Sequence, residues 1–219
     1  MCFLLGRVGR VNRVVPLAIL FTSAVLGGSA AWADPPENVV RIEEDWELVI
    51  GTPNTDSTAP QIVCVMSANG STVNPHAMFT LNHHSEPDFV PGGLQIQVWQ
   101  GEQCIHARSD PSSATLSQAN ETVRWTQVLT VDENGLGFEV VDGTSTTWGN
   151  FGGQGYLKAI VDPQVNSLSS YTPDFSVSNS GVGYAANRVQ SLVLRRIRYV
   201  TSSGDVYEDS TARTVVSNP

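Results

Sequence analysis

The feature that most constrains the fold is a succession of short segments in which apolar and polar residues alternate. In LQIQVWQ (residues 94–100), the three aliphatic residues fall on one side of an extended chain, and Trp99 falls on the other side with two glutamines. Turn residues separate such segments, and no stretch of a dozen residues shows helical spacing of apolar positions. The sequence therefore predicts an all-β protein, a two-sheet antiparallel β-sandwich of the jelly-roll kind.

The expected strands follow from the alternation and from the turns between them. Asp132-Glu133-Asn134-Gly135 is read as one turn and Asp142-Gly143 as a two-residue hairpin. The last expected strand is apolar on both faces and so is predicted to be central in its sheet. The strands are expected at Trp46–Ile50, Gln61–Ser67, Ala77–Asn82, Leu94–Gln100, Cys104–Arg108, Thr122–Val131, Leu136–Val141, Thr144–Trp148, Tyr156–Val161 and Val189–Thr201.

The first 33 residues have the pattern of a secretory signal peptide. Three arginines precede an apolar run from Val14 to Leu26, and the small-residue site Ala31-Trp32-Ala33 follows. The apolar run is shorter than the roughly 20 residues that a membrane-spanning helix needs. Cleavage after Ala33 and a secreted or periplasmic location are expected, with an uncleaved anchor as the alternative.

The remaining chain has the length of one domain. We expect a lead-in at 34–40, the sandwich at 41–213 and a free tail at 214–219. The full chain has a net charge of −9, and loss of the arginines of the leader makes it more acidic. Such a charge disfavours nucleic acid and anionic membranes as partners.

Two cysteines follow the leader, Cys64 and Cys104. In an oxidising compartment they are expected to pair as a disulfide. The alternative is two separately buried thiols.

A glycine-rich stretch, TTWGNFGGQG, places Trp148 and Phe151 where little side-chain bulk surrounds them. Two interpretations stay open. The aromatic rings fold back as a plug over one end of the sandwich, or they form a platform on which a sugar stacks. Trp99, on the polar face of its strand, is a further candidate for sugar binding.

The run WTQVLTVDENGLGFEVVDGTSTTW, within Phe79 to Tyr199, resembles the central hairpins of concanavalin A-like sandwiches. This superfamily includes the laminin-G-like domains, the legume lectins and the glucanases. The resemblance implies a curved jelly-roll whose relatives bind or cleave carbohydrate, although a shared fold does not transfer a function.

The segment EEDWE resembles the E-x-D-x-E signature of laminarinase-type glucanases. That resemblance implies Glu43 as nucleophile, Asp45 as helper and Glu47 as acid/base. A straight strand separates positions 43 and 47 by roughly 13 Å, beyond the roughly 5.5 Å of a retaining pair. The competing interpretation is an acidic, solvated lead-in to the first strand.

Histidines and carboxylates, the side chains that ligate metal ions, cluster in one segment of the sequence. His83, His84, Glu86 and Asp88 lie in one polar segment, but adjacent histidines on a strand point to opposite faces. Calcium would prefer oxygen ligands such as those of Asp132, Glu133, Asn134 or Asp162. No cofactor is predicted, and calcium is the ion that remains open.

Other polar residues complete the candidate site. Asn179, Tyr184 and Asn187 could hydrogen-bond a sugar if their loop lies beside Trp148. Arg195, Arg196 and Arg198 are expected to pair with carboxylates of the same chain.

We therefore expect a secreted, non-catalytic binding module with an extracellular glycan as its ligand. The alternatives are a glycoside hydrolase using the EEDWE carboxylates and a structural or adhesive surface protein without a small ligand.

Overall fold

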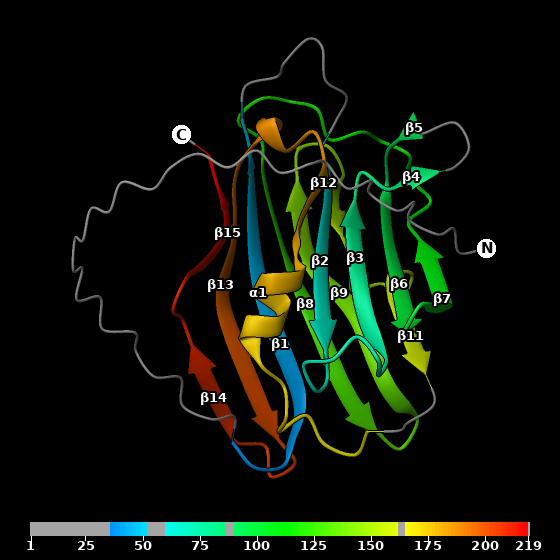
Figure 1. The fold of residues 1–219 in the computed structure, drawn as a ribbon, viewed down its shortest axis with the longest axis vertical. Helices are drawn as coiled ribbons and strands as arrows, with labels where there is room; N and C mark the ends of the chain where they lie inside the picture. Colours follow the sequence, from blue (N-terminus) through cyan, green and yellow to red (C-terminus); the bar gives the residue numbers. More distant parts are fainter. Residues whose placement is uncertain (1–35, 52–59, 86–89, 162–164, 219) are drawn as a thin grey trace, which may run out of the picture. The chain divides into compact units, whose positions relative to one another are not determined.

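Two antiparallel β-sheets pack against each other in the computed structural model, which describes residues 36–51, 60–85, 90–161 and 165–218 (Figure 1). The expected two-sheet sandwich is confirmed, whereas the predicted signal peptide lies outside the described residues. The larger sheet has the order β10 (Gly149–Phe151), β9 (Gly135–Ser145), β8 (Thr122–Asp132), β1 (Val39–Ile50), β13 (Val189–Thr201), β14 (Val206–Asp209), with β11 (Lys158–Val161) paired to β9 and β15 (Arg213–Ser217) paired to β13. The smaller sheet has the order β12 (Gly181–Tyr184), β2 (Gln61–Ser67), β3 (His76–Leu81), β6 (Leu94–Gln100), β7 (Gln103–Ser109), and β4 (His84–Ser85) pairs with β5 (Val90–Pro91).

Strand β1 lies between β8 and β13 in the larger sheet. Its side chains alternate, so that Ile42, Trp46 and Leu48 are fully or almost fully buried between the sheets. The expectation of a solvated acidic lead-in is wrong, because the acidic run belongs to this strand, which begins at Val39. Alternating carboxylates fit a strand that has one face in the core and one face outside.

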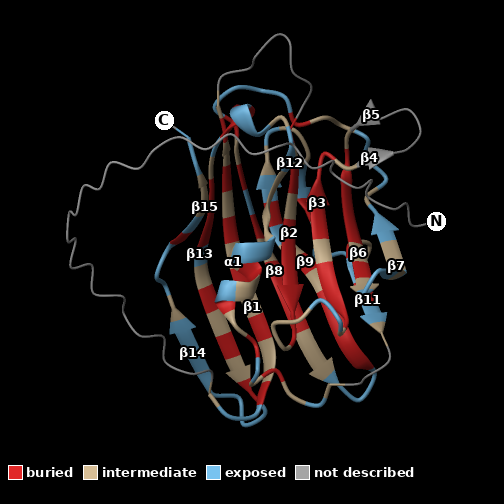
Figure 2. Cartoon of the chain, viewed as in Figure 1, coloured by how far each residue is buried: buried red, intermediate tan, exposed pale blue. Residues whose placement is uncertain are grey.

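The core is formed by aromatic and aliphatic side chains from the facing sides of both sheets. Trp46 and Trp125 stack with ring centroids 6.3 Å apart, and Phe79 of the smaller sheet meets Trp125 edge-on at 5.7 Å. Figure 2 shows buried positions recurring along β1, β13, β2 and β3, with exposed positions on the edge strands β7 and β14. Trp125 is therefore a core residue, as the sequence predicts.

The expected hairpin at Asp142-Gly143 is wrong, because β9 runs through both residues. Arg124 pairs with Thr144 and Thr126 with Val141, so two residues of β9 face one residue of β8, which is a β-bulge. Asp142 takes the left-handed conformation, with φ 52°. The chain reverses three residues later, between β9 and β10. The expected turn at 132–135 does join β8 to β9, whose residues Asp132 and Gly135 are paired.

The C-terminal part contains elements that the sequence did not indicate. The short helix α1 (Pro173–Asn179) lies beside β2, and the 3₁₀ turn η1 (Ala186–Arg188) leads into β13. β15 pairs with β13, so the expected free tail is wrong. Two helical turns are too short for a periodic signal, and β15 has only five residues.

Glu44 is a fully buried carboxyl on the inner face of β1. It accepts hydrogen bonds from the Tyr171 hydroxyl, from Trp46 Nε1 at 2.9 Å and from Gln127 Nε2 at 3.2 Å. These donors come from β1 itself, from β8 and from the segment before α1. The carboxyl therefore connects that segment to the middle of the larger sheet.

The predicted disulfide between Cys64 and Cys104 is wrong, because Cys64 is a free and fully buried thiol. Cys64 lies on β2 and Cys104 on β7, with β3 and β6 between them. Three strand spacings amount to about 14 Å, whereas bridged cysteines have Cα atoms about 4.4–6.8 Å apart.

We expect the Cys64 thiol to be protected in the folded protein. Burial raises the pKa of this thiol well above its ordinary value, which keeps it protonated and unreactive. Alkylation followed by mass spectrometry of the peptide containing Cys64 should show modification only after denaturation. Labelling at the same rate before and after denaturation would contradict this placement.

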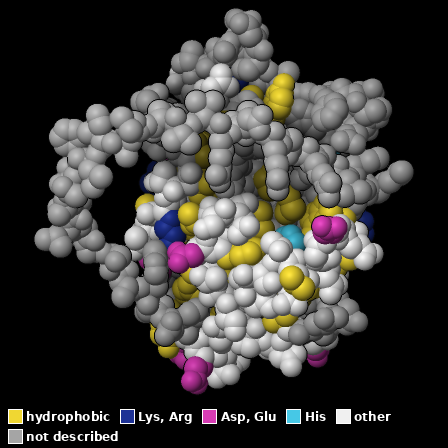
Figure 3. All heavy atoms as spheres, in the orientation of Figure 1, with side chains coloured by type: hydrophobic (Ala, Val, Ile, Leu, Met, Phe, Trp, Pro, Cys, Tyr) yellow, Lys and Arg dark blue, Asp and Glu magenta, His cyan; other side chains and the backbone are white. Residues whose placement is uncertain are grey.

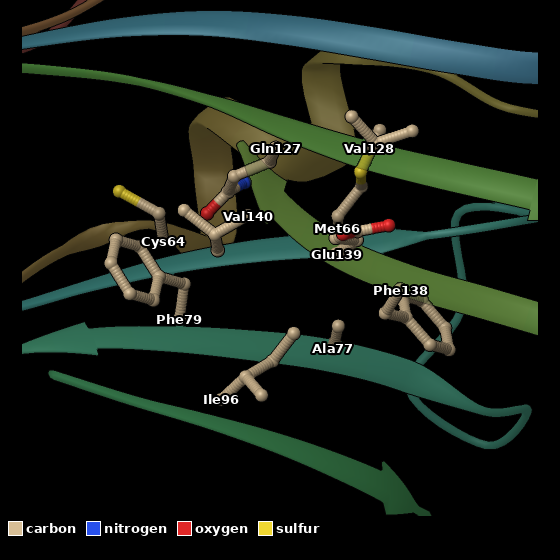
Figure 4. Close-up of a pocket in the computed structure, with 10 residues that line it drawn as sticks. All are labelled: Cys64, Met66, Ala77, Phe79, Ile96, Gln127, Val128, Phe138, Glu139 and Val140. Carbon is tan, nitrogen blue, oxygen red and sulfur yellow. The ribbon is translucent and has the colours of Figure 1, made fainter. Parts of the chain in front are cut away.

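A small cavity lies between the sheets beside Cys64 (Figure 4). Its volume is about 10 Å³, and its lining includes Met66, Phe79, Phe138 and Gln127. This volume corresponds to about one water molecule. A sugar therefore cannot occupy this cavity.

Candidate functional site

The outer face of the smaller sheet carries polar, uncharged side chains around one tryptophan. Cross-strand pairs join His76 to Trp99, Met78 to Gln97 and Thr80 to Gln95. These six residues of β3 and β6 are called the Trp99 face below. The neighbouring β2 contributes Gln61, Val63, Val65 and Ser67 to the same side. In Figure 3 the described part of this side is mostly white and yellow, with charged side chains at its borders.

Trp99 is partly exposed near the end of β6, and its orientation is defined by a hydrogen bond. The indole Nε1 donates to Gln97 Oε1 at 3.0 Å. Gln97 is two residues earlier on the strand and therefore lies on the same face. Because Gln97 accepts through its oxygen, its NH₂ group remains a donor on this face.

Gln95 is the most buried amide of the Trp99 face, with 9 % of its surface exposed. Its Nε2 donates to Ser109 Oγ of β7 at 3.0 Å. Its Oε1 is buried and has no hydrogen-bond partner in the described structure. A buried acceptor without a donor costs free energy.

His76 adds no charge to the Trp99 face at neutral pH. Burial lowers the pKa of its imidazole, which therefore stays neutral. The ring Nδ1 lies 3.3 Å from the carbonyl oxygen of Asn74. The strands β2, β3 and β6 contain no Asp, Glu, Lys or Arg, so the face as a whole is electrically neutral.

The outer face of the larger sheet is of the opposite character, because its charged side chains pair across the strands. The carboxylates of the EEDWE segment share this face, as their alternation predicts. Arg195, Arg196 and Arg198 of β13 each pair with one of them, which confirms that these arginines are used internally. The ion pairs are Glu43 with Arg41 and Arg198, Asp45 with Arg196, and Glu47 with Arg124 and Arg195.

The ion pairs of Glu43 and Glu47 lower the pKa of both carboxyl groups. A hydrogen bond from Arg195 lowers the pKa of Glu47 despite partial burial. Burial acts to raise the pKa of Glu43, but contacts with Arg41 and Arg198 outweigh it, and the net shift is downward. A glycosidase needs one protonated and one ionised carboxyl group. The pKa of both Glu43 and Glu47 is lowered, so both favour the ionised form.

Phe151 and Trp148 pack into one end of the sandwich. Phe151 is 3 % exposed, and its ring lies 6.4 Å from that of Phe79 and 6.1 Å from that of Trp148. Trp148 is partly buried, and its Nε1 donates to the Ala114 carbonyl oxygen at 2.8 Å. Both placements match the interpretation of the two rings as a plug.

The structure separates Trp148 from Trp99. The Ala114 carbonyl that accepts from Trp148 also accepts from Gly93 N at 2.9 Å, immediately before β6 begins. Trp99 lies six residues further along that strand, or roughly 20 Å away. The two tryptophans therefore belong to opposite ends of the sandwich and do not form one platform.

The remaining sugar-binding candidates also lie away from Trp99. Asn179 ends α1 and donates through Nδ2 to the Phe175 carbonyl oxygen at 2.8 Å. Tyr184, on β12, is 49 % exposed, and Asn187 is exposed in η1. Since β2 and β3 lie between β12 and β6, Tyr184 is at least about 14 Å from the Trp99 strand.

The metal candidates are only partly described. Glu86, Asp88 and Asp162 lie outside the described residues. Among the residues that the structure does describe, no group of three His, Cys, Asp or Glu is placed to hold a metal ion. Within the same ranges, no helix has the length and apolar character needed to cross a bilayer.

The sequence indicated part of the Trp99 face. The alternation in 94–100 places Gln95 and Gln97 on the side of Trp99. His76 and Met78 join them through the register between β3 and β6, which no local pattern reveals. No protein-family model matches the chain, and a search of the curated proteins gives no match.

Proposed function

We propose that this protein is a non-catalytic carbohydrate-binding module whose binding surface is the Trp99 face. The observation that carries the proposal is a partly exposed indole in line with two amides on a face without charge. An indole offers a flat apolar surface to the C–H side of a sugar ring. Amide groups offer both donors and acceptors to its hydroxyl groups.

The resemblance to concanavalin A-like sandwiches supports this proposal, because the relatives in that superfamily bind or cleave carbohydrate. The two antiparallel sheets are compatible with such a fold. Export, which the leader pattern predicts, would bring the protein to extracellular or periplasmic glycans. The ion-paired state of Glu43 and Glu47 favours binding over cleavage.

Replacing Trp99 with alanine is expected to weaken glycan binding by roughly 1–3 kcal/mol, the magnitude of stacking on an aromatic platform. The melting temperature should change little, because the ring lies on the outer face of its sheet and is partly exposed. A glycan array identifies the ligand for wild-type protein, and isothermal titration calorimetry then compares the variants.

The matched control is Tyr207→Ala, which removes a 50 % exposed aromatic residue from β14 of the other sheet. This variant should bind as the wild type does. Absence of any glycan ligand for the wild type, or unchanged binding by Trp99→Ala, would refute the proposed site.

A further inference from the structure

We propose that a row of aromatic side chains carries one-electron oxidation from the core of the protein to its surface. In order, this aromatic row contains Trp125, Trp46, Tyr171, Tyr199 and Tyr207. A buried tryptophan that absorbs ultraviolet light loses one electron, which molecular oxygen takes up, and the aromatic row refills the vacancy with an electron from the surface. The row therefore moves oxidative damage out of the core, independently of glycan binding.

The inner part of the aromatic row is continuous in space. The indole rings of Trp125 and Trp46 stack with their centroids 6.3 Å apart and their planes at 6°. Trp46 Nε1 donates to Glu44 Oε2 at 2.9 Å, and the Tyr171 hydroxyl donates to the other oxygen of the same carboxyl group. One carboxyl group therefore joins the indole to the phenol. Since electron transfer weakens steeply with distance, aromatic groups in such close succession favour it.

The outer part of the aromatic row leads to solvent. Tyr171 and Tyr199 meet edge-on with ring centroids 5.9 Å apart. Tyr199 of β13 is the cross-strand partner of Tyr207 of β14, and residues directly opposite each other share a face with Cβ atoms about 4.5–5.5 Å apart. Exposure rises along the three tyrosines, from 1 % and 8 % to 50 %. Because β14 lies at the edge of the larger sheet (Figure 1), the row ends at the surface.

Glu44 provides the proton acceptor that the oxidation of a buried tyrosine needs. Burial raises the pKa of Tyr171 well above its ordinary value, so the phenol keeps its proton while the ring is intact. A phenol that loses an electron becomes a strong acid and passes its proton to a hydrogen-bonded base. When an electron from Tyr171 fills the vacancy on Trp46, the hydroxyl proton therefore moves to Glu44 Oε1 and leaves a neutral phenoxyl radical.

The transfer is completed at Tyr207, where electrons and protons balance. Tyr207 gives one electron across the Tyr199 ring to Tyr171, which takes its proton back from Glu44. Tyr207 releases its own proton to water and keeps the unpaired electron. The net change is one electron moved from Tyr207 to oxygen, which becomes superoxide, and one proton moved to solvent. Two such radicals from different molecules then form a carbon–carbon bond between their rings, and the ring hydrogens shift to restore both phenols as dityrosine.

Tyr184 provides an internal control for this pathway. It lies on β12 of the smaller sheet and is 49 % exposed, so an oxidant that attacks from solution meets it as readily as it meets Tyr207. The full-length protein is irradiated in air-saturated buffer with ultraviolet light that tryptophan absorbs, and dityrosine-linked peptides are quantified by mass spectrometry. We expect at least threefold more cross-linking at Tyr207 than at Tyr184, because only Tyr207 ends the aromatic row.

Two variants interrupt the aromatic row at the same point. Tyr171→Phe removes the phenol, and Glu44→Gln keeps the size of the acceptor but removes the base. Each should reduce cross-linking at Tyr207 at least threefold and raise the oxidation products of Trp46 and Trp125 at least twofold, provided that thermal unfolding still shows a folded protein. Tyr184→Phe is the matched control and should leave both yields unchanged.

The comparison of Tyr207 with Tyr184 in the wild type does not depend on how well any variant folds. Equal cross-linking at the two tyrosines would overturn the proposal. Unchanged yields in a folded Tyr171→Phe variant would overturn it as well. Either result would leave the proposed glycan binding at the Trp99 face untouched, because the two proposals share no residue.

Discussion

Replacing Glu44 with alanine is expected to lower the free energy of unfolding by about 3–5 kcal/mol. The substitution removes the acceptor for the Tyr171 hydroxyl, the Trp46 indole and the Gln127 amide, all in the fully buried surroundings of the carboxyl group. It also leaves a cavity between α1 and the larger sheet. Chemical denaturation monitored by tryptophan fluorescence measures the loss.

The matched variant Glu44→Gln keeps the size of the side chain but cannot titrate. It therefore separates the effect of Glu44 protonation on stability from the effect of packing. Burial raises the pKa of Glu44 above its ordinary value of 4.5, and the hydrogen bonds it accepts offset this only in part. Between 4.5 and that raised value, the folded state holds more protons than the unfolded state, so the free energy of unfolding falls as pH rises. The glutamine variant lacks this dependence. Its stability relative to the wild type should therefore increase with pH through the same window.

Other groups contribute pH dependence of the opposite sign. Contacts with arginines lower the pKa of Glu43 and Glu47, so their contribution is lost as pH falls. These contributions are common to the wild type and to Glu44→Gln and cancel in the difference. A difference that stays constant with pH would show that Glu44 titrates normally. Loss of less than about 1 kcal/mol in Glu44→Ala would contradict its role in holding the segment before α1.

Replacing Phe151 with alanine is the second change with a large expected effect, a loss of about 3–5 kcal/mol in the free energy of unfolding. The ring is 3 % exposed and packs between Phe79 and Trp148. Trp148→Ala should cost less, about 2–3 kcal/mol, because that ring is only partly buried. Thermal and urea unfolding of both variants provide the measurement, and Tyr207→Ala is again the exposed aromatic control.

Gly143 offers a sharper test of the same packing. A Cβ atom at this position would lie 2.2 Å from the Phe151 ring. Gly143→Ala should therefore destabilise the wild type strongly but cost much less when Phe151 is already alanine. The double-mutant cycle should give a coupling above about 1 kcal/mol. Additive effects would mean that the ring does not occupy the space beside Gly143.

The fold class was predictable because each strand carries its own signal. Period-two alternation and turn residues located β2, β6 and β13 at their observed bounds. The prediction of the hairpin at Asp142-Gly143 was wrong because the same local sequence is compatible with two structures. Asp142-Gly143 favours a left-handed residue, which a hairpin turn and a β-bulge use equally well, and only the pairing with β8 decides between them.

The candidate site was less predictable, because it depends on which strands become neighbours. The sequence allowed a disulfide between Cys64 and Cys104, but β3 and β6 lie between their strands. The carboxylates of EEDWE resemble a catalytic motif in the sequence. In the structure they bind arginines of β13, which lie about 150 positions later in the chain. His76 joined Trp99 in the same way, through strand register.

The position of β1 also affects when the protein can fold during its synthesis on the ribosome. One hydrogen bond from Thr126 of β8 to Asp45 of β1 spans 81 positions, and one from Arg198 of β13 to Glu43 of β1 spans 155. Pairing between such distant segments is slow, and here it cannot finish until almost the whole chain has been synthesised. Until then the carboxylates of β1 lack the arginines of β13, and their mutual repulsion opposes premature pairing. A chain that has to pass through a membrane unfolded, as the leader pattern predicts for this one, gains the time to do so.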